Sequence, residues 1–228
     1  MRTHLLWVLI FLPLVAHAAG DLDNRVAPAD MASYRGPKCL LSVADFAVEI
    51  PGAPREVGDG LREMLQTALF QSNHFVVVDR LDTSGISAEQ LLSDSFMADA
   101  DAILLTGQMD PAEILVYGTL ADLTSSGAGL RLKMPWMPFN AGGTYANTKA
   151  TINLRAVDTA TGRVLAVSNV ESTASAKRGS AGATFTGIDM PVELEMFRNT
   201  PIELCLRDAI YRAVIDITKT IPADYYRH

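Results

Sequence analysis

The side chains that most often perform catalysis are scarce in this sequence of 228 residues. Of its four histidines, His4 and His17 lie in an N-terminal segment that we expect to be removed. His74 stands where an expected helix gives way to a strand, and His228 is the last residue. A histidine-based triad or a zinc site needs several such side chains held together. We therefore interpret His74 as a structural histidine and expect no metal site.

Signals for nucleotide binding are weak as well. The phosphate-binding pattern G-x-x-x-x-G-K-[ST] does not occur, and Gly127-Ala128-Gly129 precedes strand-like residues rather than a helix. No set of residues supplies a nucleophile, a base and oxyanion donors together. The sequence therefore predicts a protein that is not an enzyme and that needs no cofactor.

The two cysteines, Cys39 and Cys205, are the remaining reactive side chains. In an exported protein they could form a disulfide, which would contribute on the order of 4 kcal/mol because it would close a long loop. Alternatively, they are two small buried apolar residues. Spacing alone does not show whether their side chains lie within reach of each other, so both interpretations stay open.

Residues 1–18 have the pattern of a signal peptide. Arg2 and His4 precede the apolar run 5–15, and Ala16-His17-Ala18 matches the signal-peptidase pattern. The apolar run is too short for a membrane-spanning helix. We expect export with cleavage near Ala18, and no lipid anchor, because no cysteine stands near that position. Residues 19–38 contain prolines and charges without periodicity and predict an N-terminal tether.

The charge balance argues against nucleic acid as a partner. The formal net charge is −7, from 26 acidic and 19 basic residues. A surface that binds phosphates needs clustered lysines and arginines. The roughly 210 residues after the signal peptide are enough for one domain with extensions, so we expect a single domain over 39–228.

The hydrophobic pattern of this domain predicts an α+β fold, with a mixed β-sheet and helices packed on it. Strands are expected over 39–46, 75–78 and 114–123, with 75–78 at the centre of the sheet. Apolar stripes with helical spacing cover 61–69 and 202–217, and Ser87 with Gln90 has capping-box spacing for a further helix. Pro201 suits the first turn of the last helix, and Pro222 ends it.

The segment 150–170 predicts an antiparallel hairpin. Polar and apolar residues alternate from Thr151 to Arg155, turn residues occupy 158–162, and a run rich in β-branched residues follows. Two longer excursions flank this hairpin, at about 127–151 and 174–200. Both alternate polar and apolar residues with a period of two.

That alternation is compatible with outer-membrane hairpins. Each excursion is about long enough for two strands of roughly 9 to 11 residues and a turn. Four strands per chain cannot close a useful barrel, so insertion requires several copies. The lumen-facing candidates are Arg131, Lys133, Lys149, Asp189, Glu193 and Glu195. The lipid-facing candidates are Leu130, Leu132, Ile188, Met190, Val192 and Leu194. Alternatively, both excursions are solvated ribbons, an interpretation favoured by Pro135, Pro138 and Pro191, because proline removes a ladder donor.

Five pieces of the sequence, in their order and spacing, resemble the CsgG/HfaB family, which includes the curli secretion channel. They are GLREMLQTALFQSNHFVVVDR, ILVYGTLADL, TINLRAVDTATGRVLAVSNVESTAS, AGATFTGID and NTPIELCLRDAIYRAVIDI. The resemblance covers most of 39–221. It implies an α+β periplasmic domain that assembles into a ring. Each subunit would send two hairpins into a shared outer-membrane β-barrel for protein export, without catalysis.

Two features depart from the family pattern. Family channels are usually lipoproteins with a cysteine at the cleavage point, where this chain has Ala18 and Ala19. The loop 47–57 lacks the Tyr, Asn and Phe set that narrows the curli channel, so no constriction residues are assigned.

The expected function is a homo-oligomeric ring at the periplasmic side of the outer membrane that exports or anchors a surface protein or filament subunit. Its excursions are either inserted in that membrane or solvated, as set out above. The alternative is a soluble periplasmic interaction module that binds an envelope machine, as the penicillin-binding-protein activator LpoB does on a related domain. Dependence on detergent distinguishes the two.

Overall fold

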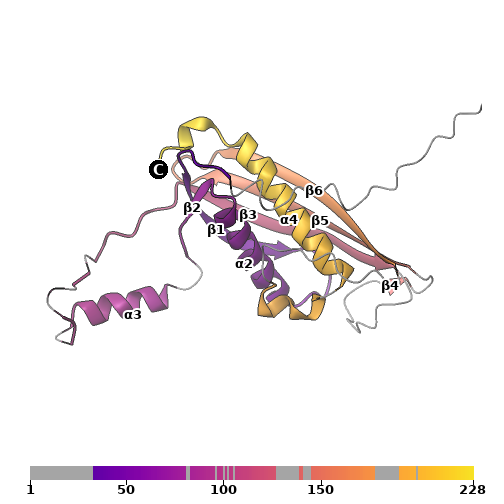
Figure 1. Cartoon of the computed structure of the whole chain (residues 1–228), viewed down its shortest axis with the longest axis horizontal. Coiled ribbons are helices and arrows are strands. Elements are labelled where there is room, and N and C mark those ends of the chain that lie inside the picture. The colour runs from indigo at the N-terminus through magenta and orange to yellow at the C-terminus, as the bar shows by residue number, and fades with distance from the viewer. Residues whose placement is uncertain are drawn as a thin grey trace, which may run out of the picture.

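The computed structural model describes residues 33–80, 83–95, 97–99, 101, 103–104, 106–126, 139–140, 145–177, 190–198 and 200–228. Within them a six-stranded mixed sheet is packed against helices (Figure 1). The predicted α+β architecture of sheet and helices is confirmed. No described helix combines the length and the apolar character needed to cross a membrane.

The main strands lie side by side in the order β2-β1-β3-β5-β6. Their bounds are β1 (Cys39–Val48), β2 (Phe75–Val77), β3 (Ile114–Ser126), β5 (Tyr145–Asp158) and β6 (Val164–Lys177), and the two-residue β4 (Phe139–Asn140) pairs with the end of β3. β1 runs parallel to both β2 and β3. β5 is antiparallel to β3 and to β6.

β2 is therefore an edge strand, and the prediction that 75–78 lies at the centre of the sheet is wrong. A short apolar run looks the same in sequence whether strands or loops cover its sides. Here Phe75 is buried on one side of the strand against Tyr226, with ring centroids 6.2 Å apart. Val76 points away and is exposed.

Two long helices cover one face of the sheet. They are α2 (Arg55–Gln71) and α4 (Pro201–Thr220), and the sheet residues beneath them include the fully buried Ile152 and Leu154. α4 is fixed to the strands by polar contacts: Cys205 Sγ donates to the Thr148 carbonyl at 3.2 Å, and Ser172 Oγ donates to Asp208 Oδ2 at 2.5 Å.

The ends of α4 agree with the sequence prediction. Thr200 is the N-cap, and its side chain accepts the backbone N–H of Glu203. Pro201 occupies the first turn, where its missing N–H leaves no bond unmade. The helix ends before Pro222, and a short 3-10 helix, η4 (Ala223–Tyr225), follows.

The helix predicted near Ser87 exists but begins earlier, as α3 (Ser84–Ser93) with Thr83 at its N-cap. The Ser87 N–H bonds to the Thr83 carbonyl, so Ser87 lies inside the first turn rather than capping it. α3 stands clear of the sheet and of the other helices (Figure 1).

The predicted hairpin at 150–170 is confirmed and is longer than expected. β5 and β6 pair from Tyr145 with Lys177 to Val157 with Val164. Gly162, with a φ of 69°, takes the left-handed conformation that its turn requires.

In this structure the end of the second excursion is helical rather than extended. Residues Val192–Phe197 form a 3-10 helix, η3, which packs against α2. Leu194 and Phe197 are fully buried. The alternation of apolar residues with period two does not exclude this conformation, because the apolar side chains at 190, 194 and 197 also suit a short helical turn with one buried side.

The candidate disulfide is also absent. Cys39 on β1 and Cys205 on α4 are both buried, and no disulfide joins them. Each thiol fills a place in the core, and the Cys205 thiol donates to a strand carbonyl, so the second interpretation of the cysteines holds.

Candidate functional site

The sheet face opposite α2 and α4, here called the outer face, has no described helix over it. From Thr148 to Asp158 and from Ala166 to Ala174 the even-numbered residues are buried, while the odd-numbered ones are exposed or half-buried. The register shifts next to the β5–β6 turn, so that Val164, which pairs with Val157, is exposed as well. The outer face comprises Tyr117, Thr119, Lys149, Thr151, Asn153, Arg155, Val157, Val164, Val167, Asn169, Glu171 and Thr173. An uncovered face of an antiparallel sheet is usually solvated. The side chains that it exposes therefore indicate which kinds of molecule it can bind.

The middle of the outer face consists of cross-strand polar pairs. Lys149 Nζ lies 2.7 Å from Glu171 Oε2. The hydrogen bond to Glu171 raises the Lys149 pKa above its ordinary value, so this lysine stays charged. Asn169 Nδ2 donates to Asn153 Oδ1 on the neighbouring strand. These pairs satisfy one another across the strands. Asp122 on β3 pairs with Thr151 and adds a further carboxylate to this part of the outer face.

The end of the outer face near the β5–β6 turn is different, because it combines apolar and basic side chains. Val167 is 62% exposed, and Val164 is also exposed. The guanidinium carbon of Arg155 lies over the Tyr117 ring, 5.1 Å from its centre, so the two side chains form a cation–π contact. Arg163 is exposed at the turn itself. We call Arg155, Arg163, Val164 and Val167 the turn patch.

β6 has no strand partner on its second side among the described residues. Such an edge presents backbone groups that can pair with another chain. One backbone group of β6 already has a side-chain partner, because Arg212 Nη1 donates to the Glu171 carbonyl at 3.0 Å. The edge and the outer face together therefore form a surface suited to contact with another protein.

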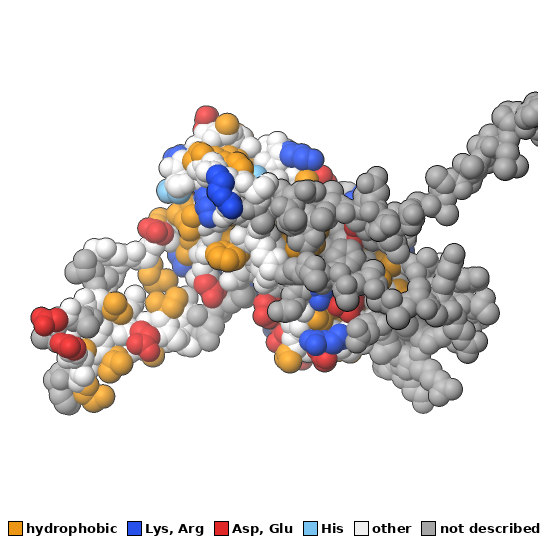
Figure 2. All heavy atoms as spheres, in the orientation of Figure 1, with side chains coloured by type: hydrophobic (Ala, Val, Ile, Leu, Met, Phe, Trp, Pro, Cys, Tyr) orange, Lys and Arg blue, Asp and Glu red, His pale blue; other side chains and the backbone are white. Residues whose placement is uncertain are grey.

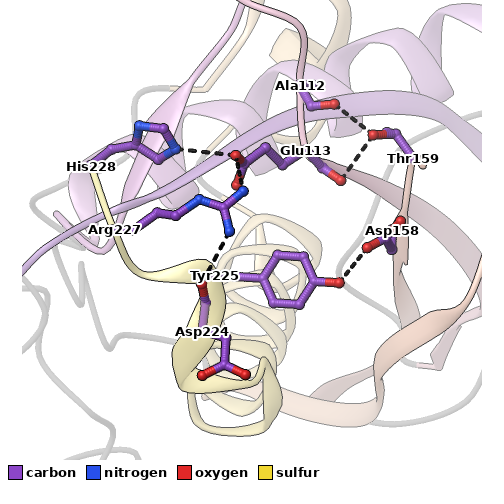
Figure 3. A network of polar contacts seen from close by, with 8 residues as sticks. All are labelled: Ala112, Glu113, Asp158, Thr159, Asp224, Tyr225, Arg227 and His228. Atoms are coloured by element: carbon purple, nitrogen blue, oxygen red, sulfur yellow. Dashed lines mark hydrogen bonds and ion pairs between the residues drawn. The ribbon is translucent and has the colours of Figure 1, made fainter. Parts of the chain in front are cut away.

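A group of titratable side chains lies at the same end of the sheet, around the C-terminal residues (Figure 3). Glu113 Oε1 accepts from Arg227 Nη2 and lies 3.3 Å from His228 Nε2. Thr159 Oγ1 donates to the Glu113 carbonyl at 3.0 Å. The backbone N–H groups of Arg227 and His228 both bond to the Lys38 carbonyl.

A second contact of this network joins Tyr225 to Asp158 (Figure 3). Because the Tyr225 hydroxyl donates to it, the Asp158 carboxyl has a pKa below its ordinary value, and the same bond raises the pKa of Tyr225. The contacts of the network fasten the segment after α4 to β3 and to the β5–β6 turn, while Glu113 Oε2 is buried without a hydrogen-bond partner. We therefore assign the network to stability rather than to chemistry.

The described residues hold no group of three or more His, Cys, Asp or Glu that could bind a metal ion. The ring of His74 stacks on Tyr34 with centroids 3.9 Å apart, and its Nδ1 lies 2.8 Å from the Ser72 carbonyl. These contacts place His74 in a structural role, as the sequence predicted.

The residues predicted to face a membrane or a lumen are distributed over several environments. Lys149 lies on the outer face, and Glu195 pairs with Arg198 at 2.7 Å on η3. Glu193 is half-buried and Val192 is 81% exposed. Met190 and Leu194 are buried in the core of the chain, so their predicted lipid-facing position does not hold in this structure. Leu130, Arg131, Leu132, Lys133, Ile188 and Asp189 lie outside the described residues.

In the part of the chain that the structure describes, helices cover one face of a mixed sheet, and the other face carries a basic apolar patch beside an edge strand. Such a surface is suited to contact with another protein. The particular family follows from the sequence comparison. The model of CsgG, the curli production assembly/transport component, matches residues 38–226. The chain therefore belongs to the CsgG family, and the resemblance noted in the sequence is confirmed. Membership indicates an envelope-associated assembly or transport component.

None of the curated proteins compared with the chain matches it. Three similar solved structures differ widely in sequence. A hypothetical protein from Chlamydia trachomatis is 13% identical, with a TM-score of 0.48 over 82% of this chain and 99% of that one. The PelC dodecamer from Paraburkholderia phytofirmans is 10% identical, with a TM-score of 0.40 over 80% and 94%. The LpoB C-terminal domain from Salmonella enterica is 12% identical, with a TM-score of 0.31 over 63% and 90%.

Proposed function

We propose that this chain is a subunit of a CsgG-like homo-oligomeric ring at the periplasmic side of the outer membrane. The ring exports or anchors a surface protein or filament subunit and performs no catalysis. Membership of a family of curli production assembly/transport components supports the class of function. The expected signal peptide supports the location.

The observation on which the proposal mainly rests is that both connecting segments leave from one end of the sheet. β3 ends at Ser126, β5 begins at Tyr145 and β6 ends at Lys177. Ser126 pairs with Asn147, and Tyr145 pairs with Lys177, so these three chain ends are neighbours. Two hairpins that enter a membrane from the same side need this arrangement.

The length of the second segment sets a condition on insertion. Only residues 178–189 lie between β6 and the buried Met190. Two strands that cross an outer membrane need roughly 20 residues. Insertion therefore requires η3 to leave α2 and become extended, after which Val192 and Leu194 would share one side of a strand.

The burial of η3 also favours a second candidate function, the soluble periplasmic interaction module. With Met190, Leu194 and Phe197 buried in its core, the chain has a soluble form in which these apolar side chains need no membrane to cover them. In that case the outer face and the β6 edge would bind a component of an envelope machine, and the chain would stay monomeric in buffer.

Detergent extraction followed by negative-stain microscopy tests the proposal. A ring former should fractionate with outer membranes and appear as uniform rings in detergent. A monomer in plain buffer, absent from the membrane fraction, would support the interaction module instead.

The variant Val192→Arg makes the test specific to insertion. Val192 is exposed in the soluble form, so the substitution should leave that form stable. At mid-membrane on the lipid side, an arginine costs about 2 to 4 kcal/mol, so the membrane-bound fraction should fall sharply. Val192→Ile is the matched control. Equal membrane fractions for the two variants would contradict a lipid-facing position.

A further inference from the structure

The connection between β2 and β3 carries an arm that has no partner in the described structure. The arm comprises residues 83–110 and includes α3. Its base is held together by Arg80 Nη2, which donates to the Asp110 carbonyl at 2.5 Å. Further out, the Leu104 N–H bonds to Ser93 Oγ at 2.7 Å. α3 makes no substantial contact with another described helix or strand and projects away from the sheet (Figure 1).

The arm holds a large share of the exposed apolar surface. Among the described residues, thirteen large apolar side chains are exposed, and seven of them belong to the arm. They are Ile86, Leu91, Leu92, Met97, Ile103, Leu104 and Met109. Leu91 and Met97 are each more than 70% exposed. A concentration of this kind normally marks a surface that another molecule covers.

The charge of the arm restricts what that molecule can be. Residues 83–110 include five acidic residues and no lysine or arginine. The acidic residues are Glu89, Asp94, Asp99, Asp101 and Asp110, all of them exposed. Figure 2 shows orange and red side chains together over this part of the molecule. Negative charge disfavours an anionic lipid surface and favours an apolar surface with basic groups.

The turn patch on the outer face has the complementary chemistry. Val164 and Val167 are exposed there beside Arg155 and Arg163. The acidic group closest in sequence, Asp158, has its carboxylate occupied by the Tyr225 hydroxyl and the Thr161 N–H. The patch is therefore apolar with net positive charge.

In a single copy the arm and the turn patch are both uncovered. We propose that the arm of one copy docks on the turn patch of the next copy. This inference rests on the proposed ring and names the contact that forms it. Each copy offers one arm and one patch, which makes the contact head-to-tail. Head-to-tail contacts form a ring where the rotation between copies closes, as the proposed ring requires.

Cross-linking between copies tests the docking directly. Leu91→Cys and Val167→Cys are placed in separate full-length chains, in which the two natural thiols are buried. The chains are co-assembled and oxidised. A covalent dimer should form in the mixture and in neither chain alone. A further chain carries both Leu91→Cys and Val167→Cys and is oxidised at high dilution. If the disulfide forms only within that single chain and never between chains, the proposal is overturned.

A second experiment measures assembly without cross-linking. Leu91→Asp and the pair Arg155→Glu with Arg163→Glu should each raise the protein concentration needed for half-assembly at least tenfold. Phe70→Asp is the control, because Phe70 is also strongly exposed but belongs to α2 and to neither the arm nor the patch. All these side chains are at the surface, so the urea midpoint of the monomer should stay unchanged.

The outcomes separate this docking from the proposed function. If the natural chain forms rings and Leu91→Asp forms them equally well, the docking is wrong and the ring stands. If Leu91→Asp loses binding to phosphatidylethanolamine vesicles but not assembly, the arm binds lipid and the docking is again wrong. If the natural chain never assembles, both fail.

Discussion

Gly60 on α2 provides the sharpest test of how η3 sits in the soluble form. In a helix, replacing glycine by alanine usually stabilises by about 1 kcal/mol. Here a Cβ at position 60 would lie 2.6 Å from Cγ of Leu194 and 3.1 Å from Cβ of Glu193. Carbon atoms pack at about 3.5 to 4.0 Å, so η3 would have to move outward by roughly 1 Å.

Overpacking of this size costs about 1 to 3 kcal/mol, which exceeds the helical gain. Gly60→Ala should therefore lower the unfolding free energy by about 1 kcal/mol, measured by urea denaturation of the soluble chain followed by circular dichroism. Leu194→Ala removes the atom that clashes and itself costs about 2 to 5 kcal/mol. In the Leu194→Ala background, Gly60→Ala should raise the unfolding free energy. The double variant should therefore lose less unfolding free energy than the sum of the losses in the two single variants.

Gly85 on α3 is the matched control. A Cβ there would meet nothing within 4 Å, so Gly85→Ala should show only the helical gain, seen as a stronger helical signal. If Gly60→Ala is stabilising in the natural background as well, then η3 does not pack against α2 in solution and the reasoning fails.

Three further outcomes are expected. Thr200→Ala should lower the unfolding free energy by about 1 kcal/mol in urea denaturation, because it removes the N-cap of α4. Cys39 and Cys205 should resist iodoacetamide in the folded chain, since both are buried and burial raises the Cys39 pKa to about 12; modification detected by mass spectrometry would contradict this. Dithiothreitol should leave the urea midpoint unchanged. Asp158 has a lowered pKa in the folded chain. Its contribution to stability is therefore present above the pKa of the unfolded state and is lost as pH falls through the pKa of the folded state. The stabilities of the natural chain and of Tyr225→Phe should therefore converge as pH falls from neutral through the folded-state pKa of Asp158, and parallel profiles would refute the role of that bond.

The parts of the fold that the sequence predicted correctly are those with long, regular patterns. The apolar stripe of α4 has a proline in its first turn and another just after its end, so its position was well defined. The hairpin of β5 and β6 has strict alternation and a turn with glycine. Both elements bury one whole side, which keeps the spacing of their apolar residues regular.

The errors concern short segments, where spacing is ambiguous. Three apolar residues at 75–77 fit an edge strand as well as a central one. Around Leu194, alternation over a few residues also fits a short helical turn, and the decisive contact is with Gly60, far away in sequence.

The interaction surface was harder still to predict. Leu91 and Leu92 look like core residues of a helix in the sequence, and only their exposure in the structure shows that no other described element covers them. The turn patch depends on Arg155 and Val167 becoming cross-strand neighbours, which requires the register of β5 and β6.

The attachment of the arm also bears on how chains of this kind can diverge. Val77 and Ile114, which flank the connection, both pair with Leu41 from opposite sides. Their backbones are thus two strand spacings apart, about 10 Å, whatever is inserted between them. A shorter or longer insert would leave the register of the parallel strands as it is. A change in this one insert could therefore change which protein the arm binds, while the sheet and the helices packed on it stay the same.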